Sequence, residues 1–92
     1  MSTPRIIPNG EGEILEVAGD RVRILVDSEQ SGGRCVQFET ITAPGAGPPL
    51  HRHGRDDELF FVLEGSVKFH VNGQETVVGP GASVFAPRGS VH

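Results

Sequence analysis

The chain has 92 residues, a formal net charge of −4 at pH 7 and only one lysine, Lys68. This length suits one small domain, so we expect a single domain at residues 1–92. Without a basic stripe or an apolar stretch of membrane-spanning length, we expect no nucleic-acid partner and no membrane span. Met1–Gly10 contains two prolines and no apolar run, so we expect no signal peptide and a cytoplasmic protein.

After an N-terminal arm at residues 1–12, short apolar-rich runs alternate with turn residues. Each run has the length of a strand and is rich in Val, Ile, Phe or Thr, and helical spacing is nowhere sustained. The predicted strands are Glu13–Ala18, Arg21–Asp27, Arg34–Ala43, Leu59–Glu64, Ser66–Val71, Glu75–Val78 and Ala82–Ala86. Strands at this spacing predict an all-β, antiparallel sandwich or barrel.

The turns between these strands have recognisable chemistry. Gly19-Asp20 predicts a two-residue hairpin between the first two strands. Asn72-Gly73 is a stronger hairpin signal, because both turn positions need a positive φ. Gly79–Gly81 predicts a further turn, and Ser28–Gly33 a longer polar loop.

The strand at residues 58–64 is apolar on both of its faces. Alternation places Glu58, Phe60 and Val62 on one face, and Leu59, Phe61 and Leu63 on the other. Both faces should therefore be covered. A barrel interior covers one face, and a second sheet or subunit must cover the other, so we expect a homodimer.

Four residues have the pattern of a metal site. His51 and His53 are two apart, which on a strand puts both imidazoles on one face. Glu58 opens the next strand and can fold back beside them, and His92 can close the site from another strand. Imidazole and carboxylate ligands suit one divalent ion of Fe, Mn, Ni, Cu, Co or Zn.

Two segments then resemble the conserved motifs of the cupin superfamily. Residues 45–65 follow the first motif, with Gly45, His51, His53, Glu58 and Gly65 at its fixed positions. Residues 81–92 follow the second motif, with Gly81, Pro87, Gly89 and His92. The resemblance implies a double-stranded β-helix, or jelly-roll barrel, and a centre of three histidines and one glutamate.

The second motif of the family continues for three more residues to an asparagine, and further strands follow it. This chain stops at His92. Either the chain is cut short within the second motif, which leaves the barrel incomplete at its C-terminal end, or the missing strands come from elsewhere.

The resemblance extends to bacterial cupins similar to quercetin dioxygenases, and it leaves three functions open. The first is a metal-dependent dioxygenase acting on a small organic molecule, with Glu58 as ligand or base. The second is a metallocupin that binds a small ligand without turnover, and the third is an oxygen-independent isomerase, decarboxylase or lyase. The expected substrate-binding residues are four apolar side chains and one arginine: Phe60, Val62, Phe69, Phe85 and Arg88.

Overall fold

The computed structural model describes residues 4–17, 19–47 and 49–92. It contains seven strands and, in these ranges, no helix, so no helix there could cross a membrane. All strand pairs are antiparallel, and the predicted fold class is confirmed. The chain divides into two compact units, Met1–Pro48 and Pro49–His92. That its 92 residues form one domain stays a prediction.

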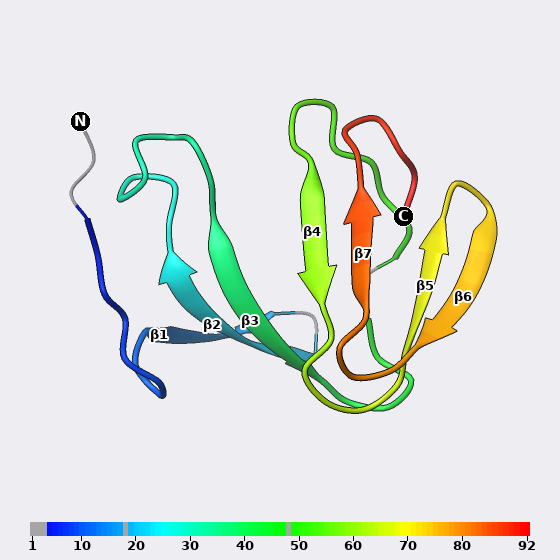
Figure 1. The fold of residues 1–92 in the computed structure, drawn as a ribbon, viewed down its shortest axis with the longest axis horizontal. Helices are drawn as coiled ribbons and strands as arrows, with labels where there is room; N and C mark the ends of the chain where they lie inside the picture. Colours follow the sequence, from blue (N-terminus) through cyan, green and yellow to red (C-terminus); the bar gives the residue numbers. More distant parts are fainter. Residues whose placement is uncertain (1–3, 18, 48) are drawn as a thin grey trace. The chain divides into compact units, whose positions relative to one another are not determined.

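The first unit is a three-stranded sheet in the order β1 (Glu13–Val17), β2 (Asp20–Val26), β3 (Gln37–Thr42) (Figure 1). The predicted hairpin connects β1 and β2, but Asp20, predicted as a turn residue, pairs with Val17 and with Thr42 and so begins β2. Ala18, the expected last residue of the first strand, lies outside the described residues.

The third strand begins at Gln37, three residues later than predicted. The side chain of Ser31 explains the difference. Its hydroxyl accepts hydrogen bonds from the amides of Arg34 and Cys35 and donates one to the Cys35 carbonyl, at 2.7 Å. These bonds hold residues 34 and 35 in the preceding turn, because a serine hydroxyl competes with strand pairing for backbone groups.

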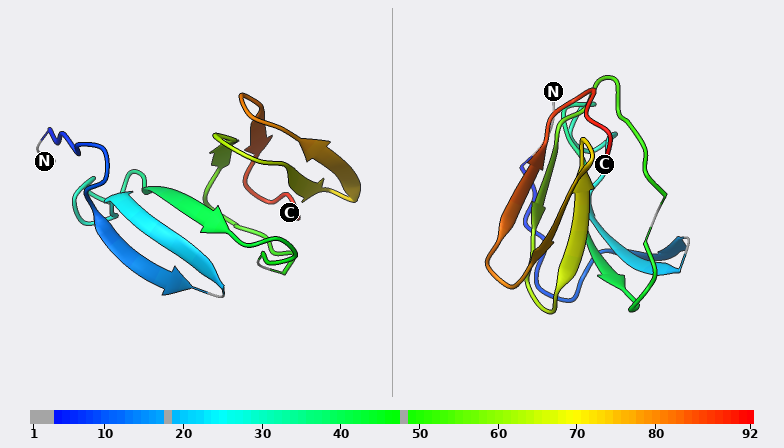
Figure 2. Two further views of the ribbon diagram at one scale, coloured as in Figure 1. Left: turned by 90° about the horizontal axis from the view of Figure 1, so that it is seen from below. Right: turned by 90° about the vertical axis from the view of Figure 1, so that its right-hand side faces the viewer.

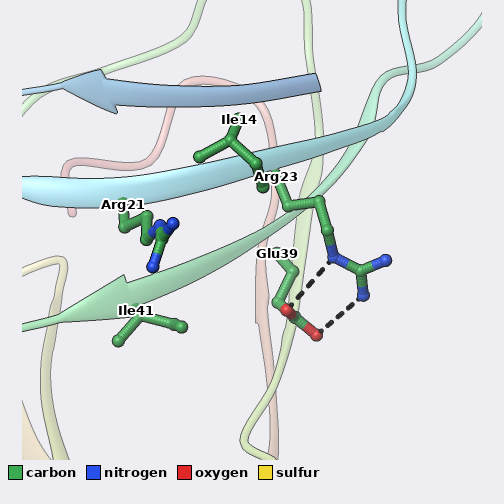
Figure 3. Close-up of a pocket in the computed structure, with 5 residues that line it drawn as sticks. All are labelled: Ile14, Arg21, Arg23, Glu39 and Ile41. Atoms are coloured by element: carbon green, nitrogen blue, oxygen red, sulfur yellow. Dashed lines mark hydrogen bonds and ion pairs between the residues drawn. The ribbon is translucent and has the colours of Figure 1, made fainter. Parts of the chain in front are cut away.

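One face of this sheet carries an ion pair between neighbouring strands. Arg23 of β2 lies opposite Glu39 of β3, with Nη2 and Oε2 3.3 Å apart (Figure 3). A shallow hollow surrounds the pair, lined by Ile14, Arg21, Arg23, Glu39 and Ile41. None of the predicted site residues lines this hollow.

The second unit contains two two-stranded sheets. β4 (Glu58–Phe61) pairs with β7 (Ser83–Ala86), and β5 (Val67–Val71) pairs with β6 (Gln74–Val78). The predicted hairpin between β5 and β6 is confirmed, with φ of 48° at Asn72 and 82° at Gly73. Both angles lie in the left-handed region that asparagine and glycine tolerate best.

The two sheets of the second unit meet through aromatic packing. The rings of Phe60 in β4 and Phe69 in β5 have centroids 5.1 Å apart, and the hairpin lies beside the β4–β7 sheet in each view (Figures 1 and 2). Val62 and Ala86 are buried. In the described residues the strands form three separate sheets and do not close into a hydrogen-bonded barrel.

Candidate metal centre

Residues of both motifs meet through a short antiparallel pairing in the second unit. Arg52 forms an isolated bridge with Val91. On one side of this bridge, the His51 amide donates to the His92 carbonyl at 2.7 Å, and the His92 amide donates to the His51 carbonyl at 2.9 Å. The backbone therefore places His92 directly beside His51.

A turn at residues 87–90 directs the backbone toward this pairing. The Ser90 amide donates to the Pro87 carbonyl at 3.0 Å, and the Gly89 amide donates to the His53 carbonyl at 2.7 Å. Gly89 has φ of 83° at the third position of the turn, where type II turns need glycine. The fixed glycine of the second motif thus has a conformational role next to the site.

The four predicted ligands lie together. His51, His53, Glu58 and His92 each offer one ligand atom, and these atoms all lie within 4.8 Å of one another. Nε2 of His53 contacts Oε1 of Glu58, and Nε2 of His92 lies 3.4 Å from Oε2 of the same carboxylate. Metal binding by these residues stays a prediction, and their geometry permits it.

The surroundings of two imidazoles also fit a metal ion. The His92 side chain is only 7% exposed, and neither of its ring nitrogens has a hydrogen-bond partner among the described residues. Burying such groups unpaired is costly, and a metal ion would satisfy one of them. Nδ1 of His51 lies 2.9 Å from the Pro49 carbonyl, which can only accept, so Nδ1–H donates and Nε2 is left for a ligand bond.

An ion pair joins the loops that precede the ligands Glu58 and His92. The Arg88 amide donates to Oδ1 of Asp57 at 2.8 Å, and its guanidinium donates to both carboxylate oxygens, at 3.2 and 3.1 Å. These hydrogen bonds, with the attraction of the guanidinium charge, hold the pKa of Asp57 below its ordinary value and raise the pKa of Arg88. Arg88 was expected to meet an anionic substrate, whereas in the structure its side chain is engaged with Asp57.

The predicted apolar wall is only partly assembled. The Phe60 ring lies 6.0 Å from the His92 ring and so stands beside the cluster, and Phe69 packs against Phe60 with ring centroids 5.1 Å apart. Val62 is buried two residues beyond Phe60. Phe85 is placed differently: it pairs with Leu59, on the face opposite Glu58, and is 56% exposed. The alternation of β7 therefore turns Phe85 away from the ligands, which corrects its expected place in the wall.

His70, the remaining histidine, does not join the cluster. It lies on β5, and its Nδ1 is 3.7 Å from Oε2 of Glu75 on β6. Ligand spacing alone does not identify two contacts near the site: that of the Pro49 carbonyl with His51, and that of the Asp57 carboxylate with Arg88. A signal for the second was present, because Asp57 directly precedes Glu58 and Arg88 is the only charged Asp, Glu, Lys or Arg residue of the second motif.

Two sequence segments, which meet at an isolated antiparallel bridge and through the β4–β7 pair, thus bring three histidines and a glutamate to one place. This arrangement defines an all-β protein with a candidate metal centre. The sequence model of the cupin domain family matches residues 38–92, and the chain belongs to this family.

A curated relative is consistent with the family. The chain is 28% identical over 92 residues to a protein of Bacillus subtilis (strain 168) named quercetin 2,3-dioxygenase. The match covers 99% of this chain but 27% of that protein. No solved structure matches the chain at a significant level.

Proposed function

We propose that this chain forms the metal centre of an oxygenase-type cupin that acts on a small organic molecule. The observation that carries the proposal is the cluster itself, with four ligand atoms within 4.8 Å and a buried His92 whose ring nitrogens have no hydrogen-bond partner in the described part of the chain. A donor set of three imidazoles and one carboxylate suits Fe, Mn, Ni, Cu, Co or Zn, and which of them is bound depends largely on availability.

A divalent transition ion held there would supply open coordination positions and, if redox-active, a route for electrons between substrate and dioxygen. The chain's own residues have distinct parts. The imidazoles of His51, His53 and His92 hold the site from two segments. The Glu58 carboxylate lowers the net charge, and it can accept a substrate proton when it is not acting as a ligand. Phe60 forms an apolar wall beside His92, and Phe69 packs against Phe60.

The name of the relative suggests the substrate class. That protein is named for quercetin, and the phenylalanine wall suits a planar aromatic molecule of this kind. We therefore propose quercetin or a similar small aromatic compound as the first substrate to test. A cytoplasmic location, a homodimer and the absence of nucleic-acid and membrane partners remain part of the same proposal.

The test combines metal content with oxygen uptake. Protein purified without added metal is expected to carry about one transition ion per chain by mass spectrometry. The double variant His51→Ala, His53→Ala should lose it, because two of four ligands are gone, whereas His70→Ala, a matched loss of a histidine outside the cluster, should keep it. Oxygen uptake with quercetin should follow the metal content across these three proteins.

Other outcomes separate the rival functions. Metal retained by the His51→Ala, His53→Ala variant would overturn the proposed centre. Quercetin binding with full metal content but without oxygen uptake would favour a non-catalytic binding protein. Turnover of the substrate under anaerobic conditions would favour an isomerase, decarboxylase or lyase.

A further inference from the structure

The asparagine of the β5–β6 turn makes two hydrogen bonds outside its own hairpin. The Asn72 amide donates to the Val91 carbonyl at 2.8 Å, and the Val91 amide donates to Oδ1 of Asn72 at 2.9 Å. The side chain thereby completes an amide–carbonyl exchange of the kind that two paired strand residues make. Val91 directly precedes His92, so the turn is tied to the segment that carries the fourth candidate ligand.

We propose that Asn72 is a positioning residue for His92. The inference rests on the proposed metal centre and adds a residue to it from outside both motifs. Asn72 then has two structural roles. It forms the hairpin turn between β5 and β6, and it fixes the backbone at Val91, which places His92 beside the other candidate ligands.

The position of His92 depends more on its backbone than on hydrogen bonds of its side chain. Its imidazole makes no hydrogen bond within the described residues, although Nε2 lies 3.4 Å from Oε2 of Glu58. Its place therefore follows from this contact, from packing against His51 and Phe60, and from the backbone that carries it. The backbone of this segment is held on one side by the two bonds to His51 and on the other by the two bonds to Asn72. Removing the Asn72 side chain takes away one of these four bonds and leaves the Val91 amide without its acceptor.

The conformation of Asn72 allows its contact with Val91 to be tested separately from its role in the turn. Its φ of 48° is tolerated by glycine, asparagine and aspartate better than by other residues. Glycine supplies the turn geometry without an acceptor, because Gly-Gly also suits this type of hairpin. Aspartate supplies both the geometry and an acceptor oxygen at the same reach. Asn72→Gly therefore removes the anchor selectively, and Asn72→Asp is its matched conservative control.

The first measurement is a titration of metal-free protein with Co²⁺. Calorimetry gives the affinity, and the visible absorption of the bound ion reports on its ligands. Asn72→Gly is expected to weaken Co²⁺ binding about tenfold, the lower end of the effect seen when a ligand loses its supporting contacts. The visible bands should shift toward those of His92→Ala, because they depend on the number and geometry of the ligands. Asn72→Asp should keep the wild-type affinity and spectrum.

A double variant shows whether the effect passes through His92. If it does, adding Asn72→Gly to His92→Ala should weaken Co²⁺ binding no further, since the ligand that Asn72 positions is already absent. A full additional tenfold loss would mean that the glycine disturbs the site generally, and this would overturn the inference.

Amide hydrogen exchange gives a readout that needs no metal. The Val91 amide should exchange several times faster in Asn72→Gly than in wild type and Asn72→Asp, while amides of the β4–β7 ladder stay unchanged. Unchanged Val91 exchange, or wild-type Co²⁺ binding by Asn72→Gly, would overturn the positioning role alone. A wild-type chain that binds no Co²⁺ would instead overturn the proposed function, and the positioning role with it.

Discussion

At the scale of single residues, Asp57 and Arg88 give a direct electrostatic prediction. Because Arg88 holds the pKa of Asp57 below its ordinary value of 3.8, Arg88→Gln should raise that pKa toward 3.8. The sign follows from the carboxylate being the form that the guanidinium stabilises. Carbon-detected NMR titration of the Asp57 carboxyl in metal-free protein measures the change.

The pH dependence of the pair has the corresponding sign. A lowered pKa in the folded state stabilises the fold at pH values above the unfolded pKa, and this contribution is lost as the pH falls through the folded pKa. Arg55→Gln is the matched control, because it removes a nearby positive charge that makes no ion pair with Asp57 in the structure. An Asp57 pKa that responds equally to both variants would contradict the pairing.

The sequence predicted the four candidate ligands better than it predicted the contacts around them. His51, His53 and Glu58 lie close in sequence, so strand alternation and one short loop suffice to bring them together. The place of His92 depends on a pairing with His51 across almost the whole length of the second unit, which strand alternation cannot indicate, so its assignment relied mainly on the motif resemblance. The sequence does not reveal that Arg88 pairs with Asp57, and its role in substrate binding stays a prediction.

At the scale of elements, the Phe60–Phe69 contact joins the β4–β7 sheet to the β5–β6 hairpin. Phe69→Ala should lower the free energy of unfolding by about 2 kcal/mol, less than for a fully buried phenylalanine because the side chain is half-buried. It should also weaken the binding of an aromatic ligand, since Phe69 backs the wall beside His92. Urea unfolding of metal-free protein measures the first effect.

Two variants bracket this prediction. Phe69→Leu keeps most of the apolar volume and should cost less than about 1.5 kcal/mol. Val77→Ala removes an exposed apolar side chain from the same hairpin, and it should change stability by at most about 0.5 kcal/mol. Equal destabilisation by Phe69→Ala and Val77→Ala would show that the aromatic contact contributes nothing specific.

The strands themselves were well predicted, and their ends less so. Alternating apolar residues and turn-forming glycines identified all seven, because period-2 burial is a local property of the sequence. The start of β3 was missed because the Ser31 hydroxyl captures the amides of residues 34 and 35. The start of β2 was missed because Asp20 gains partners on two strands at once.

At the scale of the whole molecule, sheet pairing depends on partners that local patterns do not encode. The antiparallel class followed from short strands and tight turns, but the pairing of β4 with the distant β7 did not. A barrel was expected from the family resemblance, and the described strands form three separate sheets. Closure needs hydrogen bonds between sheets, which no run of residues in one strand can indicate.

One apolar face of the β4–β7 sheet leads to a prediction about assembly. Leu59, Phe61 and Phe85 lie on the side away from Glu58 and are 76%, 64% and 56% exposed. An apolar surface of this kind on a sheet is rarely left in water, and a second copy can cover it by the same face. We expect a homodimer by sedimentation equilibrium, and Phe61→Glu should convert it to monomer because a buried unpaired carboxylate is costly.

The control for this experiment places the same charge on a different face. Val77→Glu, at an exposed position of β6, should leave the dimer intact and the circular dichroism spectrum unchanged. Dissociation by Phe61→Glu with retained β-sheet signal would assign the interface to the β4–β7 sheet, since loss of folding alone would remove that signal. A wild-type chain that sediments as a monomer at every concentration would exclude the dimer. The exposed face would then have to be covered within the chain or by another partner.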